Sequence, residues 1–132
     1  MKLNPDCIRD ILIAVENNTD FTHSFVYSIS NSSIESLANY SHEEIIYHIS
    51  QCDKANLIDS VQYMDGGDCV VIGDLSPEGH KFLADIRSDT VWNRVKDISK
   101  EIGLASLSSI TQIATGVATN IIKSHLVLVF LF

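Results

Sequence analysis

Five histidines are the side chains of this chain best suited to bind a metal ion or to act as a general base. His42 and His48 lie six positions apart on one predicted helix, so they point to opposite sides of it and cannot bind the same ion. The other three, His23, His80 and His125, belong to separate segments and have no partner at ligand spacing. We therefore expect no metal site and interpret the histidines as surface or helix-capping residues.

Nucleophilic and phosphate-binding motifs are missing from the sequence. No Ser or Cys lies in a nucleophile-elbow pattern such as G-x-S-x-G, and Gly66-Gly67 lacks the Lys and Ser or Thr that follow in a phosphate-binding loop. Glu43 and Glu44 project about 100° apart in the first turn of a predicted helix, where the helix dipole favours negative charge. A triad assembled from distant residues stays an alternative, but we expect a protein without catalysis and without a cofactor.

Three predicted elements position these residues in the first part of the chain. A helix from about Pro5 to Asn17, capped by Asn4, precedes a short strand at residues 25–29. Two capping boxes follow, Ser32-Ser33-Ile34-Glu35 and Ser41-His42-Glu43-Glu44, and they predict a tight helix-turn-helix. Its second helix buries Ile45, Ile49 and Cys52 and leaves on its outer side Glu43, Tyr47, Ser50, Gln51 and Lys54.

A β-hairpin is predicted directly after this helix. Val61 and Tyr63 alternate with polar or flexible neighbours, as in a half-exposed strand, and Cys69-Val70-Val71-Ile72 is the returning strand. Asp65-Gly66-Gly67-Asp68 supplies the positive φ angles of the turn. Helices starting after Ser76 and at Asp89, the latter ended by Gly103, complete the pattern. The fold class predicted is α+β, mostly α: a winged helix-turn-helix with a hairpin wing and a C-terminal helical extension.

The C-terminal segment has no charged residue from Gly103 to Ile122. Its apolar residues keep helical spacing, until Lys123, Ser124 and His125 interrupt the pattern before an unbroken apolar tail from Leu126 to Phe132. The helix could pack on the body, pair with a second copy or enter a membrane. We favour packing or self-association, because Gln112 and Asn120 are too polar for a spanning helix. The residues predicted for oligomerisation are Leu107, Ile110, Ala114, Val117 and Ile121.

The charge argues against nucleic acid as a partner. The chain carries a formal net charge of −8, and between Asn31 and Asp74 Lys54 stands against eight Asp and Glu residues. A phosphate backbone would be repelled by such a surface. The N-terminus lacks the apolar region of a signal peptide, so we expect a cytoplasmic protein. Three cysteines without metal spacing are interpreted as buried structural thiols.

Several short motifs taken together resemble an uncharacterised family of small phage and prophage proteins, a domain of unknown function with winged-helix character. The motifs are Asn4-Pro5-Asp6-Cys7-Ile8-Arg9-Asp10-Ile11-Leu12, Tyr40-Ser41, Ile45-x-Tyr47-His48-Ile49, Ala55-x-Leu57-Ile58, Leu75-Ser76-Pro77-Glu78-Gly79-His80-x-Phe82-Leu83 and Ile86-Arg87-x-x-x-Val91-Trp92. The resemblance covers residues 4 to 122 and implies a mobile-element origin, without any catalytic or binding residue to carry over. Val127 to Phe132 departs from the lysine-rich endings expected of the family.

The functional hypothesis is an acidic protein-binding or regulatory module that meets a basic partner and inhibits it. Residues 1–88 would form the winged-helix domain and residues 89–132 the extension. The partner-binding residues predicted are Glu43, Glu44, Tyr47, His48, Gln51, Asp65 and Asp68. Two alternatives remain open: a DNA-binding transcriptional regulator dimerised by the last helix, and a membrane-acting effector.

Overall fold

The computed structural model describes residues 1–30 and 34–131 and divides into two compact units, Met1–Leu83 and Ala84–Phe132. The first unit combines helices with short antiparallel strands, and the second is helical. The fold is therefore α+β and mostly α, as predicted. The division falls inside a helix, α3 (Pro77–Ile86), five residues before the boundary expected from the sequence.

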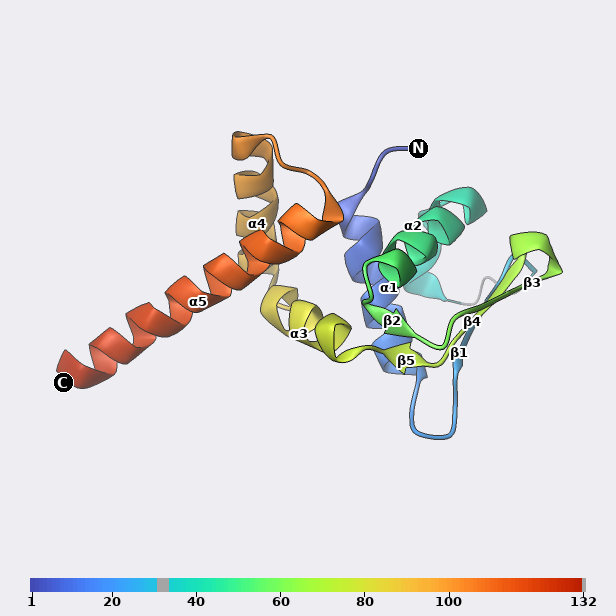
Figure 1. Ribbon diagram of the computed structural model, residues 1–132, viewed down its shortest axis with the longest axis horizontal. Coiled ribbons are helices and arrows are strands. Elements are labelled where there is room, and N and C mark those ends of the chain that lie inside the picture. The colour runs from blue at the N-terminus through green and yellow to red at the C-terminus, as the bar shows by residue number, and fades with distance from the viewer. Residues whose placement is uncertain (31–33, 132) are drawn as a thin grey trace. The chain divides into compact units, whose positions relative to one another are not determined.

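The first helix, α1 (Pro5–Asn18), begins where the sequence predicts. The Asn4 side chain accepts a hydrogen bond from the Asp6 backbone N–H at 3.1 Å, and Pro5 occupies the first helical position, where no donor is missed. Its buried face, which includes Ile8, Ile11 and Leu12, forms part of the core. α1 packs beside α2 (His42–Lys54) in the core of the first unit (Figure 1).

Two small antiparallel sheets complete the first unit. One has the strand order β1-β4-β3, formed by β1 (Phe25–Ser28), β4 (Cys69–Ile72) and β3 (Gln62–Met64). The other pairs β2 (Ile58–Asp59) with β5 (Asp74–Leu75) and was not predicted. The register places Phe25 opposite Ile72 and Tyr27 opposite Val70, and all four side chains are buried. One face of the β1–β4 pair therefore belongs to the core.

The alternation expected around Val61 is wrong in its burial pattern. Gln62, Tyr63 and Met64 of β3 are all exposed, so no face of this strand is buried. β3 is an edge strand whose backbone pairs with β4, and its placement comes from that pairing and the turn rather than from a buried face.

Two other expectations concern the segments between β1 and α2. A single 3-10 turn, η1 (Glu35–Leu37), stands where a short helix was expected, and it buries Leu37. The capping box predicted at Ser32–Glu35 begins at residues that lie outside the described part of the chain. The second capping box, at Ser41 and Glu44, is present and starts α2.

The start of α3 is held by a serine and a glycine. The Ser76 hydroxyl accepts a hydrogen bond from the Gly79 backbone N–H at 2.9 Å and donates one to the Asn56 carbonyl at 2.5 Å. A Cβ atom on Gly79 would clash with the Leu57 carbonyl oxygen. Glycine at residue 79 therefore allows α3 to lie directly against the backbone that follows α2.

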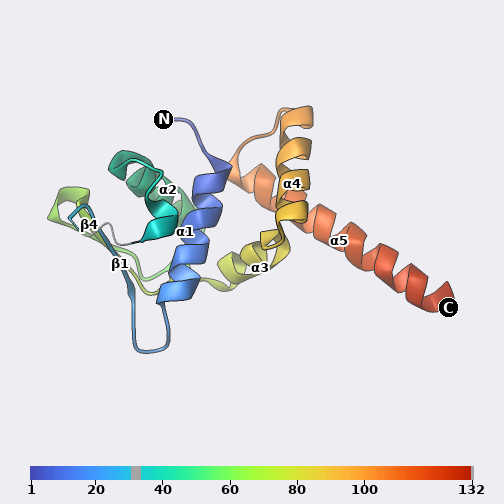
Figure 2. The same ribbon diagram turned by 180° about the vertical axis from the view of Figure 1, so that it is seen from behind.

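The second unit pairs α4 (Asp89–Ile102) with α5 (Leu107–Leu131). Ser88, and not Asp89, caps α4 by accepting from the Val91 N–H at 3.3 Å, and Gly103 ends it at a φ of 69°. Lys123, Ser124 and His125 do not interrupt α5, because exposed polar side chains are compatible with a helix. Figure 2 shows α4 beside the N-terminal half of α5 and the other half extending beyond it.

Candidate interaction site

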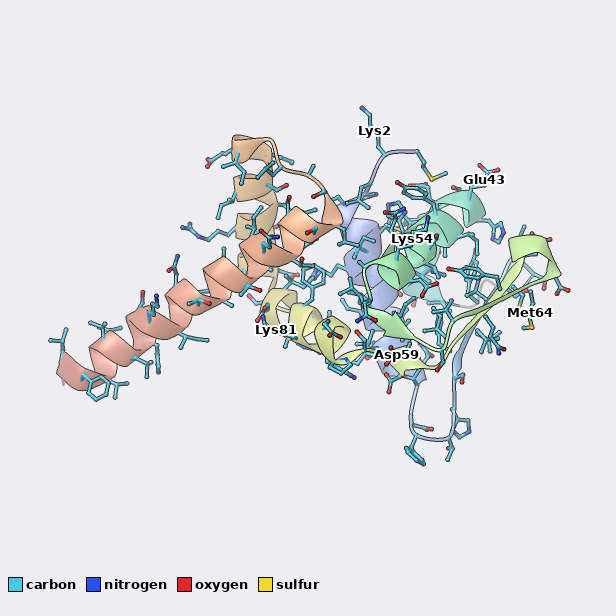
Figure 3. The ribbon with its side chains drawn as sticks, in the orientation of Figure 1. Lys2, Glu43, Lys54, Asp59, Met64 and Lys81 are labelled. Atoms are coloured by element: carbon cyan, nitrogen blue, oxygen red, sulfur yellow. The ribbon has the colours of Figure 1, made fainter. Side chains whose placement is uncertain are left out.

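The first turn of α2 presents side chains at the end of the helix that faces the hairpin. The Ser41 hydroxyl accepts from the Glu44 N–H at 3.1 Å, and the Glu44 carboxylate accepts from the Ser41 N–H at 3.3 Å. Glu44 is thus half-buried and engaged in holding the helix start, while the neighbouring Glu43 is exposed. Figure 3 shows Glu43 and Lys54 at opposite ends of α2, so the acidic residues of the first turn are far from the lysine of the last turn.

The hairpin between β3 and β4 presents two more carboxylates. Asp65, Gly66 and Gly67 all have positive φ angles, at 54°, 67° and 96°, and they form the tight turn that the sequence predicts. Asp65 and Asp68 are both exposed there. Aspartate and glycine tolerate this backbone conformation better than most residues, so the turn places acidic side chains at its tip at little cost.

His42 connects the hairpin to the helix and to β1. Its Nδ1 atom lies 2.9 Å from the Tyr27 hydroxyl, its Nε2 atom lies 3.4 Å from an Asp68 carboxylate oxygen, and its ring stacks on Tyr27 at 5.6 Å between centroids. Burial raises the pKa of Tyr27 above its ordinary value of 10, so the phenol stays protonated and can donate a hydrogen bond to Nδ1 of His42. Nε2–H then faces Asp68.

Sequence reasoning missed this role of His42, because its partners are distant in the chain. Tyr27 and Asp68 lie 15 and 26 positions away. Only the strand order, which brings the end of β1 and the start of β4 next to α2, could have indicated the cluster.

A shallow depression of about 280 Å³ lies between the first turn of α2 and the hairpin turn. It is lined by His42, Glu43, Ile46, Tyr47, Gly66, Gly67 and Asp68. The structure therefore brings together three predicted partner-binding residues from two elements, Glu43, Tyr47 and Asp68. Asp65 lies in the same turn but does not line the depression, and half-buried Gln51 lies one helical turn after Tyr47.

His48 is not available as a partner contact, contrary to the prediction. The side chain is 1% exposed, and both of its ring nitrogens are occupied. Nε2 accepts a hydrogen bond from the Asn4 backbone N–H at 2.8 Å, and Nδ1 donates to the Glu44 carbonyl at 2.7 Å. His48 thus ties α2 to the N-terminus of α1.

The negative charge of the chain is concentrated in the first unit. Residues 1–83 contain 13 of the 17 Asp and Glu residues and four of the nine Lys and Arg residues, which are Lys2, Arg9, Lys54 and Lys81. The second unit has four carboxylates and five Lys and Arg residues, so it is close to neutral. The depression therefore lies in the strongly acidic part of the protein.

Most of the predicted oligomerisation stripe is covered within the chain. Leu107, Ile110, Ala114 and Val117 are buried in the part of α5 that packs with α4, whereas Ile121 is half-exposed. The first four residues therefore pack within the chain, which was one of the alternatives for this helix, and they are unavailable to a second copy. Trp92 of α4 is also buried, and the Lys96 ammonium lies 5.6 Å from its ring centre.

The three cysteines and the carboxylates are the other groups that metal binding or redox chemistry would use. Among residues 1–30 and 34–131, no group of three or more His, Cys, Asp or Glu side chains is arranged to hold a metal ion. Cys7 and Cys52 are buried, and burial raises the pKa of Cys7 to about 12 and that of Cys52 well above its ordinary value. Both thiols are therefore protonated and structural, as predicted, while Cys69 is half-exposed.

Comparisons with known proteins were made on the sequence and the structure. Residues 2–105 match a family described as Hypothetical protein (DUF2513). A Haemophilus influenzae protein (strain ATCC 51907 / DSM 11121 / KW20 / Rd), described as "Uncharacterized protein", is 30% identical over 124 residues, covering 92% of this chain and 99% of the relative. No solved structure matches. The chain belongs to the DUF2513 family, which agrees with the resemblance to a family of unknown function.

Proposed function

We propose that this member of the DUF2513 family is a winged-helix module that binds a basic protein without catalysis. The element order, helix, strand, short turn, helix and hairpin, supports the winged-helix interpretation, as does the strand order β1-β4-β3. In a winged helix α2 would be the recognition helix and the β3–β4 hairpin the wing. These are the two elements that line the acidic depression.

The observation that carries the proposal is the charge of those two elements. A winged helix that reads DNA needs basic side chains on its recognition helix and wing, because neutralising phosphates supplies most of its affinity. Here the one Lys or Arg residue of α2 is Lys54, in the last turn. The wing turn carries Asp65 and Asp68 and no Lys or Arg. The same surface attracts a protein that itself carries a positive patch.

The depression fits an arginine side chain of such a partner. A guanidinium group can stack on the ring of Tyr47 while it donates hydrogen bonds to the carboxylates of Glu43 and Asp68. Ile46 offers an apolar wall for the methylene stem. A phage or prophage origin would place this partner in the host, as a nucleic-acid-binding or defence protein that is inhibited by an imitation of DNA charge.

The first test uses a hexa-arginine peptide as the probe of the depression. Neutralising two carboxylates that line the depression and Asp65 in the adjoining turn, in the variant E43Q/D65N/D68N, should weaken peptide binding about five- to tenfold by calorimetry. Each exposed charge contact contributes up to about 1 kcal/mol. Binding to the wild type should also weaken as salt is added, and the Tyr47, Gly66 and Gly67 amide signals should shift on titration.

The control is the variant E35Q/D59N/E78Q, which removes the same charge from exposed positions of the first unit outside the depression. It should bind the peptide nearly as well as the wild type. Equal weakening by both variants would show that only net charge matters and would contradict the proposed site. Robust binding of duplex DNA in a low-salt mobility-shift assay would favour the regulator alternative instead.

A further inference from the structure

The C-terminal half of α5 carries apolar side chains that are exposed to solvent. All of them lie beyond Val117, the last buried residue of the helix, and they are Ile121, Ile122, Leu126, Val127, Leu128, Val129, Phe130 and Leu131. Their exposed fractions range from 49% to 86%. Contiguous apolar surface of this kind marks an interaction site rather than ordinary solvent-facing helix.

The arrangement of these side chains indicates what covers them. Leu126 to Leu131 are six successive apolar residues, and successive helix positions are rotated by about 100°, so they surround the helix axis. A second helix would bury one stripe of such a segment and leave the opposite side in water. A helix that is apolar all round is buried on every side, as in the core of a large protein or in the hydrocarbon of a membrane.

The length of the exposed part of α5 indicates how much of the helix could enter a membrane. By length and composition α5 is the one helix in the described part of the chain that could cross a membrane. Only 11% of its apolar 18-residue segment is buried, whereas a core helix of a soluble protein would be mostly buried. The buried side chains are in its first half, which packs with α4. The apolar run Leu126–Leu131 is about 9 Å long, so it fits within one leaflet of hydrocarbon, which is about 15 Å deep.

Cations lie where this stretch would meet lipid headgroups. Lys123 is the one Lys, Arg, Asp or Glu residue in α5, and it precedes the apolar run by three positions. Arg94 of α4 and His125 line a groove of about 470 Å³ between the two helices, together with apolar side chains that include Ile98 and Leu128. Long cationic side chains at this level can reach lipid phosphates while the apolar residues beyond them enter hydrocarbon.

We propose that residues 121–131 of α5 dock into a lipid bilayer and hold the protein at a membrane surface, with Leu126–Leu131 in hydrocarbon and Lys123, Ser124 and His125 among the headgroups. This inference reverses the preference drawn from the sequence, in which Gln112 and Asn120 argued against a spanning helix. Gln112 belongs to the half of α5 that stays with α4, and Asn120 lies just before the inserting stretch. Neither polar side chain therefore has to enter the hydrocarbon core.

The experiment is co-flotation of the full chain with phosphatidylcholine vesicles at physiological salt. The wild type should float with the vesicles, and V129N/F130N should lower the partition coefficient by at least about tenfold, because two apolar side chains no longer enter hydrocarbon. Both side chains are exposed in the structure, so the variant should fold. Unchanged circular dichroism and fluorescence of buried Trp92 would establish that it does.

The matched control is F21N/V26N, which makes the same two substitutions at exposed residues of the first unit. It should float like the wild type. Equal flotation of the wild type and V129N/F130N would overturn the proposal. A wild type that remains unbound and forms a dimer by light scattering, with V129N/F130N monomeric, would overturn it in favour of a second copy as the occupant.

Discussion

The polar side chain of His48 is fully buried in the core of the first unit. Its ring accepts from the Asn4 N–H and donates to the Glu44 carbonyl, so both nitrogens are satisfied. The Asn4 N–H would otherwise be an unpaired donor beside the start of α1, which would cost about 1–3 kcal/mol. The His48 ring also packs nearly at a right angle to the Tyr47 ring, with 4.9 Å between the ring centroids. This contact links buried His48 to a residue that lines the depression.

Asp20 shows the opposite case, a carboxylate that is fully exposed and still perturbed. Its pKa is lowered from 3.8 to about 2, first by the His23 side chain, whose Nδ1 atom lies 2.9 Å from a carboxylate oxygen, and then by hydrogen bonds from Thr22. Because the pKa is lower in the folded chain, the turn is stabilised above pH 3.8 and loses this stabilisation as the pH falls towards about 2.

Replacing His23 by Ala removes the largest cause and should therefore raise the pKa of Asp20 towards 3.8. Replacing Thr22 by Val removes a smaller cause and should raise the pKa less. Carboxyl-carbon NMR titration of the wild type and both variants measures this order. An Asp20 signal that titrates near 3.8 in the wild type would contradict the turn geometry.

The junction between α2 and α3 depends on a close approach of two backbones. Leu57 follows the end of α2, and its carbonyl accepts from the Ser76 N–H at 3.0 Å. Gly79 lies in the first turn of α3 against the same carbonyl, where a side chain has no space. A glycine inside a helix normally weakens it by about 0.5–1 kcal/mol, so its presence here reflects packing rather than helix propensity.

Gly79→Ala should destabilise the protein by about 1–3 kcal/mol, because the added methyl forces α3 away from Leu57. Urea unfolding followed by circular dichroism measures the change. Gly116→Ala is the control: residue 116 is also inside a helix, no atom lies near its Cβ position, and this variant should be more stable by about 0.5–1 kcal/mol. Similar effects at both positions would contradict the packing argument.

Charge segregation is the property that distinguishes the whole molecule. The first unit has nine more Asp and Glu than Lys and Arg residues, and the second combines a near-neutral charge with an exposed apolar helix end. The two proposals assign these surfaces to different partners, a basic protein and a lipid bilayer. They depend on different residues and can fail independently.

Repulsion among the carboxylates of the first unit should make stability depend on salt. Raising the ionic strength should increase the unfolding midpoint by a few °C, because screening relieves repulsion between like charges. The variant E35Q/D59N/E78Q should be more stable at low salt and respond less. Thermal scans by circular dichroism at several salt concentrations measure both effects, and a midpoint that falls with salt would show that attractive ion pairs dominate.

Elements that depend on local interactions could be predicted from the order of residues. The start of α1 at Pro5, the capping box of Ser41 and Glu44, and the turn at Asp65–Asp68 all follow from hydrogen bonds and backbone angles within a few residues. For the same reason the helical stripe of α5 was visible from Leu107 to Val117. Such signals can be derived from spacing because their partners are neighbours in the chain.

Which of these faces are covered, and which side chains meet, depends on contacts between distant parts of the chain. His48 is buried against the start of α1, where it bonds to Asn4, 44 residues earlier in the chain, and His42 joins Tyr27 to Asp68 because β1 pairs with β4. α4 covers the first half of α5 and leaves the second half exposed. Periodicity identifies an apolar face but carries no information about its partner, since that partner comes from contacts between residues far apart in the chain.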